Sequence, residues 1–570
     1  MSIPRPEHPK PQFERKDWMN LNGEWAFCFD NGRSGEAREI YKSDDAFDKK
    51  ITVPFCVESE LSGIGHKDFI YGVWYKRIFS LSAEQAAKRT VFHIGAADYK
   101  TTVFVNGEKA GVHEGGYVSF AFDITSFVHE GENTVAVYCE DNTRDPLIPR
   151  GKQSELYYSH GCDYTRTTGI WQTVWLEFTP KAYVESFRFY PDYRTGTVAV
   201  TGILHGEADL KIEASYEGKS MGSAEISGAS GVFSCNIVLS EKHLWEVGCG
   251  RLYDTVISFG DDRIKTYFGL RNAWMDGYKF MLNGKSVFQR LILDQGFYPD
   301  GIYTAPSDEA LHNDIILSKS CGFNGARLHQ KVFEERFLYH CDREGYLVWG
   351  EYANWGLDHT RPDSIYSFLP EWIAEVERDF NHPAIIGWCP FNETWDQHGC
   401  KQFDPLLSTV YRATKAMDET RPCIDTSGNY HVETDIFDVH DYEQKVDVFT
   451  ARFEKFRDTD ELENHCNHRQ DYKVGQPMFM SEYGGIKWSR GEGNAWGYGD
   501  APVSEDEYKT RYKGLTDALL DCPKIMGFCY TQLTDVEQEQ NGVYYYDRTP
   551  KFKPEFFRSV NSRKAAIEKE

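Results

Sequence analysis

Short runs of alternating hydrophobic and polar residues fill the first 180 or so positions, for example at residues 101–105 and 133–138. Turns such as Asn106-Gly107 and Gly115-Gly116 separate these runs, and no long helical period interrupts them. Alternation with a period of two is typical of half-buried β-strands, and Asn-Gly is a common hairpin turn. The pattern therefore predicts a β-rich region over residues 1–180.

A second β-rich stretch is expected over residues 181–270. Its length of roughly 90 residues suits a small β-sandwich. The predicted strands lie near residues 198–204, 210–216, 232–238 and 255–259.

From residue 271 to residue 570, short apolar runs alternate with amphipathic segments, which predicts a parallel sheet with helical crossovers. Helices are expected over 307–320, with Ser307 as the N-cap, and over 370–380 and 504–520. The segment 427–436 is too short for a full helix. Eight candidate strands, the number that closes a (β/α)8 barrel, are found at residues 290–294, 324–328, 346–350, 385–390, 423–426, 437–440, 477–481 and 525–530.

The chain has 570 residues, too many for one hydrophobic core, so several domains are expected. Its 88 acidic residues outnumber 63 basic ones, and the net charge of −25 repels phosphate backbones and anionic membrane surfaces. No stretch approaches the roughly 20 apolar residues that would span a bilayer. We therefore expect a globular protein that binds neither nucleic acid nor a membrane.

The 14 cysteines include no Cys-x-x-Cys pair, and the first ten residues lack the apolar core of a secretion signal. We interpret the cysteines as reduced thiols and expect a cytoplasmic protein. An exported form with a trimmed signal is the alternative.

Two glutamates follow predicted strands of the barrel: Glu393 follows the fourth and Glu482 the seventh. Reacting groups of such barrels sit at the carboxyl ends of the strands, so we expect these carboxylates to face each other in one cleft. Retaining glycoside hydrolysis needs two carboxyl groups about 5 Å apart, one to attack the anomeric carbon and one to protonate the leaving oxygen. We assign Glu393 as the acid/base and Glu482 as the nucleophile.

These roles require one carboxyl to be ionised while the other is protonated. The apolar segment 385–391 precedes Glu393, so burial should raise the pKa of that carboxyl, and repulsion from the second carboxylate acts in the same direction. The alternative for a single glutamate at a strand end is a solvated loop residue or a helix cap. Asn392 before one glutamate and Tyr483-Gly484-Gly485 after the other favour the catalytic interpretation.

Two segments carry a resemblance to a known family: residues 381–395, Asn-His-Pro-Ala-Ile-Ile-Gly-Trp-Cys-Pro-Phe-Asn-Glu-Thr-Trp, and residues 481–485, Ser-Glu-Tyr-Gly-Gly. They resemble the acid/base and nucleophile signatures of glycoside hydrolase family 2, the β-galactosidase and β-glucuronidase family. Residues 74–77, 105–107 and 163–177 are similar to the family's sugar-binding domain. The resemblance covers nearly the whole chain.

This resemblance implies a fold and a set of roles. The fold is a jelly-roll β-sandwich over 1–180, an immunoglobulin-like β-sandwich over 181–270 and a C-terminal (β/α)8 TIM barrel over 271–570, with no further domain after the barrel. Asn392 matches the asparagine that hydrogen-bonds the sugar 2-hydroxyl. Asp163 matches an aspartate that reaches from the N-terminal domain to a distal hydroxyl, and Tyr442 resembles a tyrosine near the nucleophile. Homo-oligomers are also implied.

The sequence departs from the family pattern at three places. Arg327-Leu-His329 replaces an Arg-x-x-His-Tyr-Pro motif, so the histidine is shifted, and Tyr530 or a neighbour replaces a tryptophan after strand eight. The stretch Glu539-Gln540-Asn541 stands where glucuronidases carry an Asn-x-Lys that holds the sugar carboxylate. A glutamate there would repel a uronate and favours a neutral hexose.

Arg327 and Lys331 instead favour a uronate substrate, because either could bind its carboxylate from another side. We retain Arg327 and His329 as substrate-binding candidates. A retaining exo-β-glycosidase that acts as a β-galactosidase ranks first. A β-hexuronidase, for galacturonides before glucuronides, is second, and a carbohydrate-binding protein without turnover is the alternative of a different class.

Other kinds of site have no support in the sequence. No phosphate loop, His-Glu-x-x-His helix or Gly-x-Ser-x-Gly elbow is present, and we expect no cofactor and assign no metal ligands. The cluster His465-Cys466-Asn467-His468 is interpreted as a surface loop. The Gly-rich segment 491–499 is interpreted as a rim loop, with Trp496 and Tyr498 as candidate aglycone contacts. The expected partner is a small glycoside.

Overall fold

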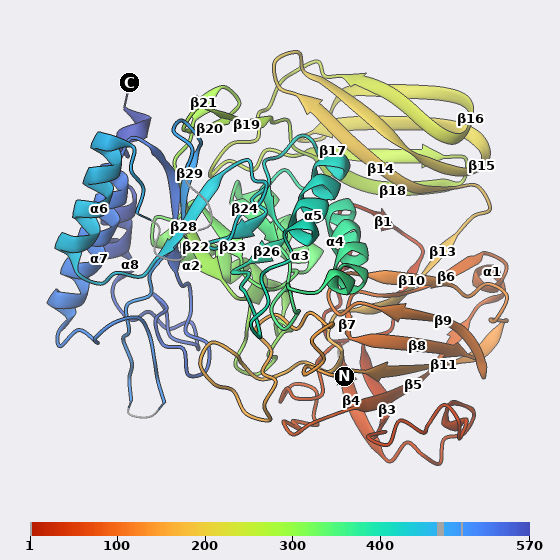
Figure 1. Cartoon of the computed structure of the whole chain (residues 1–570). Helices are drawn as coiled ribbons and strands as arrows, with labels where there is room; N and C mark the ends of the chain where they lie inside the picture. The colour runs from red at the N-terminus through yellow and green to blue at the C-terminus, as the bar shows by residue number, and fades with distance from the viewer. Residues whose placement is uncertain (1–2, 464–471, 492–493, 570) are drawn as a thin grey trace.

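The computed structural model describes residues 3–463, 472–491 and 494–569. Two β-rich units lie on one side of the molecule and a unit of parallel strands and helices lies on the other (Figure 1). None of the helices in the described ranges is long and apolar enough to cross a membrane.

The N-terminal unit is a sandwich of two antiparallel sheets around a core that includes Trp25, Phe27 and Phe92. The predicted hairpin is confirmed, because Asn106 and Gly107 both have positive φ, 50° and 82°, as a two-residue turn requires. One sheet has the order β4 (Lys49–Val53), β3 (Gly23–Phe29), β5 (Gly72–Leu81), β11 (Gly131–Glu140), β8 (Lys100–Val105) and β9 (Glu108–Glu114). The other has the order β10 (Phe120–Asp123), β6 (Arg89–Ile94), β13 (Val174–Thr179) and β2 (Trp18–Asn20).

The second unit is one six-stranded antiparallel sheet around its own apolar core. Its strands are β1 (Glu14–Arg15), β18 (Asp262–Phe268), β17 (Tyr253–Phe259), β15 (Thr197–Tyr216), β14 (Tyr183–Asp192) and β16 (Lys219–Val238). The two strands predicted at 198–204 and 210–216 are a single strand, β15. Its register shifts between Leu204 and Glu207, beside Gly206 with φ +84°, and such a bulge lets one strand bend and pair with β14 and then β17. The immunoglobulin-like description stays a prediction.

The third unit contains the parallel strands, and each of the eight predicted strands overlaps one of them. Seven form a sheet in the order β25 (Ile385–Cys389), β24 (Leu347–Glu351), β23 (Gly325–Leu328), β22 (Gln289–Asp294), β30 (Ile525–Thr531), β29 (Met478–Gly484) and β28 (Phe437–Asp441). The pair β26 (Phe391–Asn392) and β27 (Thr426–Ser427) continues it, because Trp388 bridges Cys423 and Ser427 bonds to Asp438 of β28. This pair lies between β25 and β28.

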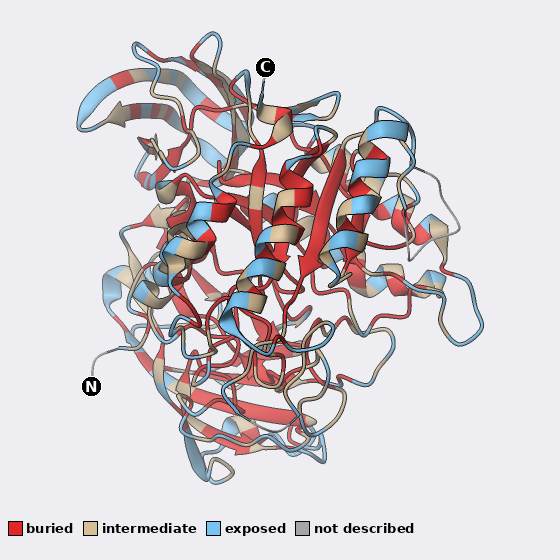
Figure 2. Cartoon of the chain, turned by 90° about the vertical axis from the view of Figure 1, so that its left-hand side faces the viewer, coloured by how far each residue is buried: buried red, intermediate tan, exposed pale blue. Residues whose placement is uncertain are grey.

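Helices cover the outside of the strands, with exposed outer faces and buried strands behind them (Figure 2). Ser307 and Ser504 cap α2 (Asp308–Ser320) and α7 (Glu505–Leu520), because the serine side chains accept from Ala310 N and Glu507 N, both at 3.2 Å. The expected helix at 370–380 begins earlier, because a 3-10 turn at Pro362–Ser364 leads into it and Pro370 lies inside. The helices are α2 (Asp308–Ser320), α3 (Glu335–Glu344), α4 (Ile365–Asp379), α5 (Asp404–Met417), α6 (Val446–Thr459), α7 (Glu505–Leu520) and α8 (Pro554–Asn561).

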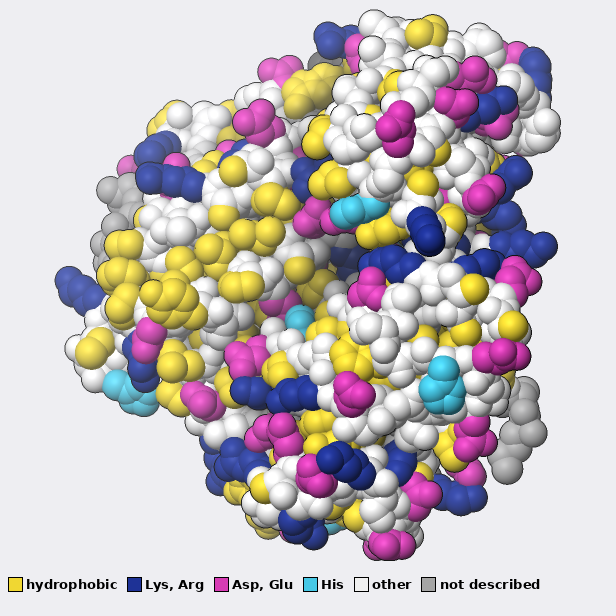
Figure 3. All heavy atoms as spheres, turned by 90° about the vertical axis from the view of Figure 1, so that its right-hand side faces the viewer, with side chains coloured by type: hydrophobic (Ala, Val, Ile, Leu, Met, Phe, Trp, Pro, Cys, Tyr) yellow, Lys and Arg dark blue, Asp and Glu magenta, His cyan; other side chains and the backbone are white. Residues whose placement is uncertain are grey.

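The loop 141–168, between β11 and β12 (Gly169–Ile170), extends from the N-terminal sandwich to the barrel. Its Arg150 N donates to Trp355 O at 2.7 Å, and the Tyr164 hydroxyl donates to Glu539 after strand eight. The molecular surface also has a hollow between the two sandwiches, and lysine and arginine side chains surround it (Figure 3). A groove between β14, β15 and α4 is lined by Arg188 and Arg378, among others, but by neither candidate glutamate.

Candidate active site

Glu393 and Glu482 come from separate strands and meet at the carboxyl end of the barrel. Glu393 directly follows β26 and has φ +47°, a left-handed conformation that non-glycine residues adopt at a cost, and its amide donates to Ser427 O at 2.9 Å. Glu482 lies in β29. Each glutamate offers a carboxylate oxygen, and His440 a ring nitrogen, and these atoms lie within 4.8 Å of one another. The expected convergence of the two carboxylates is present.

Glu482 is 5% exposed, and two donors form hydrogen bonds with its carboxylate. Arg327 Nη1 donates to Oε1 at 3.1 Å, and the Tyr442 hydroxyl donates to Oε2 at 2.5 Å. The Tyr442 ring stacks on Tyr498, with centroids 3.4 Å apart. Tyr442 therefore lies beside the candidate nucleophile, as the resemblance implied, and Tyr498 supports it from the rim loop.

Arg327, at the end of β23, connects several groups of the site through hydrogen bonds. Its Nε donates to Glu351 at 2.6 Å, Nη1 also donates to Ser481 O at 2.9 Å, and Nη2 faces both Asn392 Oδ1 at 2.5 Å and His329 Nδ1 at 3.1 Å. All five N–H donors thus have partners, and none is left for a substrate carboxylate.

Lys331 is also unsuited to the substrate contact considered above. Its ammonium donates to Gly296 O at 2.5 Å and Tyr303 O at 2.8 Å, and burial lowers its pKa to about 8. His329 is buried beside Glu351 and Arg327. Burial, aided by Lys152, lowers the pKa of His329 well below its ordinary value, so its ring is neutral, and its sugar contact stays a prediction.

Asn392 immediately precedes Glu393 and is fully buried. Its backbone N donates to Asn354 Oδ1 at 2.8 Å, and its side-chain Oδ1 accepts from Arg327. Its Nδ2 has no hydrogen-bond partner in the described parts of the chain. An unpaired buried donor beside the candidate acid/base is a group that a bound sugar hydroxyl could satisfy.

His440, which the sequence reasoning did not single out, lies between the two glutamates. Its Nδ1 is 2.7 Å from Glu393 Oε1 and 3.4 Å from Glu482 Oε2, and its Nε2 is 2.9 Å from Ser427 Oγ. Burial would lower the pKa of His440, but the two glutamates outweigh it and raise that pKa. Its position could have revealed it, because His440 ends predicted strand six. Glu393 and Glu482 were found by the same search for ionisable residues at strand ends.

The expectation that the pKa of Glu393 is raised is wrong. Burial does act in that direction, but the hydrogen bond and charge of His440, together with Lys152, outweigh it and lower the pKa. The sequence argument counted an apolar strand and a second carboxylate. It did not include a cation between the two.

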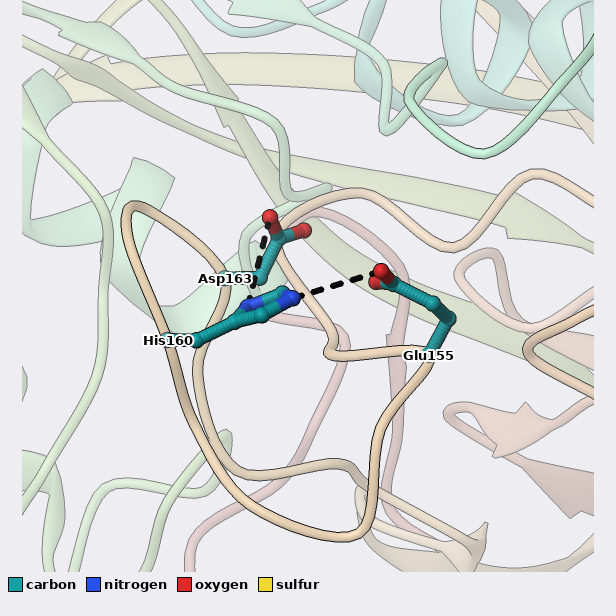
Figure 4. A group of neighbouring side chains, drawn as sticks. All are labelled: Glu155, His160 and Asp163. Atoms are coloured by element: carbon teal, nitrogen blue, oxygen red, sulfur yellow. Dashed lines mark hydrogen bonds and ion pairs between the residues drawn. The ribbon is translucent and has the colours of Figure 1, made fainter.

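Asp163 lies in the loop 141–168, and its carboxylate turns toward residues of that same loop. Arg150 Nη1 contacts Asp163 Oδ1 at 2.5 Å, and His160 Nδ1 is 3.9 Å from Oδ2 (Figure 4). Its backbone carbonyl accepts from Gln538 of the barrel at 3.0 Å. The loop is therefore tied to the barrel, while the sugar contact of Asp163 stays a prediction.

Among the residues that the structure describes, two groups have the side chains and spacing of a metal site, Glu155–His160–Asp163 and Glu393–His440–Glu482. In the first, Arg150 pairs with both carboxylates (3.1 Å to Glu155). In the second, His440 and Arg327 lie against the carboxylates. The chain itself supplies the positive charge in each group, so we assign no metal. The sequence cluster 465–468 lies outside the described residues.

Lys152 and Glu539 face the site from two different domains. Lys152 is 5% exposed, and its ammonium lies 3.6 Å from the centroid of the Trp355 ring, but within the described residues it makes no ion pair. Burial would lower its pKa, but Cys162, Glu539 and the other acidic groups nearby raise it, so Lys152 is a cation. Glu539 is 3% exposed and accepts from Tyr164 and, at 3.0 Å, from Asn541 Nδ2.

Two rim features differ in their placement. The indole of Trp496 donates to Gly161 O, which joins the rim loop to loop 141–168. Tyr530 is fully buried, and its hydroxyl lies 3.2 Å from that of Tyr508 in α7, so its ring packs behind the strand and not against a sugar.

The fold and the paired carboxylates define the class of protein, a glycoside hydrolase with a barrel catalytic domain. Residues 18–180 match the sugar-binding domain, and residues 304–515 the TIM barrel domain, of glycosyl hydrolases family 2. The chain belongs to glycoside hydrolase family 2.

Similar proteins carry two different names. A β-glucuronidase of Paenibacillus borealis is 24% identical over 97% of this chain and 98% of its own length. A β-galactosidase of Thermoanaerobacter pseudethanolicus is 25% identical over 76% of this chain and 58% of its own. The chain spans about half the length of several curated relatives that it matches.

A solved β-glucuronidase of Ruminococcus gnavus has the same fold, with a TM-score of 0.80 and 19% identity over 96% of this chain and 98% of that one. This likeness concerns the fold. Because both β-glucuronidases and β-galactosidases are among the relatives, the comparisons favour neither sugar.

Proposed function

We propose that this protein is a retaining exo-β-glycosidase that removes a terminal β-linked sugar by double displacement. The observation that carries the proposal is the proximity of Glu393 and Glu482, whose carboxylate oxygens come within 4.8 Å. Retaining enzymes have carboxyl groups about 5–5.5 Å apart, whereas inverting enzymes separate them by about 6.5–9.5 Å to admit a water molecule. The short separation leaves the second carboxylate to attack directly.

In the first step, a carboxylate oxygen of Glu482 bonds to the anomeric carbon while the bond to the leaving oxygen breaks. The proton of Glu393 goes to that oxygen. In the second step Glu393 takes a proton from water, the water oxygen bonds to the anomeric carbon and the ester to Glu482 breaks. Arg327 and Tyr442 hold Glu482 in its attacking position, and the free Nδ2 of Asn392 is available to the 2-hydroxyl.

We infer a neutral hexose, with galactose first, as the sugar. The side-chain hydrogen bonds around Glu539 donate toward its carboxylate. Gln295 Nε2 donates to the Tyr164 hydroxyl at 2.7 Å, and that hydroxyl donates to Glu539. Gln532 Nε2 donates to Asn541 at 2.8 Å, and Asn541 donates to the other oxygen of Glu539. A carboxylate supplied by donors on both oxygens suits sugar hydroxyls and repels a uronate.

A β-hexuronidase, for galacturonides before glucuronides, is the second candidate, and Lys152 favours it. A buried cation without an ion pair in the described structure is costly, and a uronate carboxylate would compensate it. The ring of Trp355 under its ammonium also connects Lys152 to the site, because Trp355 Nε1 donates to Asn392 O at 3.2 Å.

A substrate panel with two variants separates these candidates. We expect the wild type to release p-nitrophenol from the β-galactoside with a kcat/KM at least ten times that for the β-galacturonide and β-glucuronide. E539Q should lower kcat/KM on the galactoside by about 10–100-fold, the size of one lost hydrogen bond to a charged group, and should relatively favour the uronides.

K152M tests the second candidate, and K76M is its control because Lys76 is also largely buried but pairs with Asp44 of the N-terminal sandwich. A wild type that prefers a uronide, and loses that preference in K152M but not in K76M, would replace the galactosidase assignment by the hexuronidase. No release from any β-glycoside would contradict the proposed function itself.

A further inference from the structure

We propose that His440 is a positioning residue that stays positively charged between the two carboxylates and shifts its ion pair from Glu482 to Glu393 when the glycosyl-enzyme forms. The inference rests on the proposed function. It assigns a role to a side chain that contacts both carboxylates and is placed to act through them.

The direction of the hydrogen bonds shows that Nε2 of His440 carries a proton. Ser427 Oγ donates its only proton to Asp438 Oδ2 at 2.7 Å, so Ser427 can only accept from His440 Nε2 at 2.9 Å. Asp438 is ionised, because His431 lies 2.9 Å from its other oxygen and pairs with Asp425 at 2.7 Å. Burial would lower the pKa of His431, but Asp425 and Asp438 outweigh it and raise that pKa to about 10, so His431 is a cation.

With Nε2 protonated, the state of Nδ1 decides the charge. A neutral ring would point a lone pair at Glu393 Oε1, 2.7 Å away, and at Glu482 Oε2, 3.4 Å away. Two ionised carboxylates at these distances require an N–H donor, so the ring is an imidazolium when both glutamates are ionised.

The backbone beside His440 leaves space for its ring. Gly428 has φ +87°, and a Cβ there would come within 2.4 Å of His440 Nδ1. The connection from β27 to β28 therefore leaves room for the ring only because residue 428 is glycine.

The charged groups that face His440 come from every neighbouring strand. Glu393 and Glu482 favour its charged form, and Asp438 of its own strand acts through Ser427. Arg327 opposes it, although Arg327 is itself paired with Glu351. The carboxylates outweigh both burial and the arginine and raise the pKa of His440.

The charges balance through the reaction. In the substrate complex Glu482 is ionised, Glu393 is protonated, and the imidazolium pairs with Glu482. When Glu482 bonds to the anomeric carbon it becomes a neutral ester, and Glu393 becomes a carboxylate because its proton left with the aglycone. The same imidazolium then pairs with Glu393, 2.7 Å away, and hydrolysis reverses the change.

The pH profile of H440N tests this role. In the wild type the positive ring lowers the pKa of Glu393. Glu393 therefore loses its proton at a lower pH, and the alkaline limb of kcat/KM lies at a lower pH than it would without the ring's charge. Without that charge, only Lys152 and Arg327 still lower the pKa of Glu393, and we expect the alkaline limb to move up by one pH unit or more. H205N, which changes a histidine exposed on the second sheet, should leave the profile unchanged.

An alkaline limb within about 0.3 unit of the wild type in folded H440N would overturn the proposal, given that one pH unit corresponds to a tenfold change in proton affinity. Nitrogen-15 NMR of the ring is the second measurement, and it does not need turnover. We expect His440 to be an imidazolium at pH 7 both in the free enzyme and after a 2-fluoroglycoside has esterified Glu482. A neutral ring in either state would contradict it, whereas failure of the wild type on all glycosides would contradict only the proposed function.

Discussion

Residues that lie far apart in the sequence make up the charge balance of the site. Glu393 and Glu482 were predicted from strand ends, and the structure places Arg327, Tyr442 and His440 against them. The proposed acid/base thereby contacts a cation, and the proposed nucleophile contacts an arginine and a tyrosine. The two carboxylates thus differ in their neighbours, and Glu482 is buried whereas Glu393 is partly exposed.

Removal of the acid/base should affect substrates according to their leaving group. E393A should lower kcat/KM by about 10²–10⁴ on glycosides with poor leaving groups, the usual contribution of a positioned general acid. Activated dinitrophenyl glycosides should be much less affected in the first step, and azide should restore turnover and give a β-glycosyl azide. Steady-state kinetics and product NMR measure both effects. Equal losses on all leaving groups, with no rescue by azide, would assign the acid to another residue.

Sequence reasoning at this scale found the residues that carry a recognisable pattern and missed those that act through spatial neighbours. Asn392 and Tyr442 lie where the resemblance implied. Lys152 was missed, because a lysine in a loop of another domain gives no sign in the sequence that it lies over Trp355. The pKa of Glu393 was predicted in the wrong direction for the same reason, since the neighbour that reverses it belongs to strand six.

At the scale of elements, the periodicity of hydrophobic residues was enough to find the strands of the barrel. The short fifth connection was also foreseen, and residues 428–436 contain no helix. The start of α4 and the continuity of β15 were not foreseen. Pro370 is a common first residue of a helix, and a bulge interrupts alternation in the same way as a turn does.

The short connection after β27 yields a prediction for Gly428. G428A should lower stability by about 1–2 kcal/mol through its left-handed backbone, and it should also lower kcat because the new methyl group collides with His440. G63A is a matched control, because Gly63 has φ +80° with nothing within 4 Å of an added Cβ. Thermal melts and kcat of the two variants provide the comparison. Equal activity in G428A and G63A would show that the ring does not depend on this glycine.

At the scale of the whole molecule, the N-terminal sandwich contributes to the site through loop 141–168. The bond from Tyr164 to Glu539 and that from Gln538 to Asp163 O join this loop to the end of strand eight. Lys152 belongs to the same loop, so the position of this cation relative to the barrel depends on the contact between the two domains. The order of the three units follows from the sequence pattern, whereas this contact between them needed the structure.

The measurement that most directly tests the account is the anomer released first, followed by proton NMR during hydrolysis of a β-glycoside from the substrate panel. Two displacements at one carbon restore the starting configuration, so the β-anomer of the free sugar should appear first and then mutarotate. An α-anomer as the first product would show that water attacks directly, and Glu482 would then not be the nucleophile.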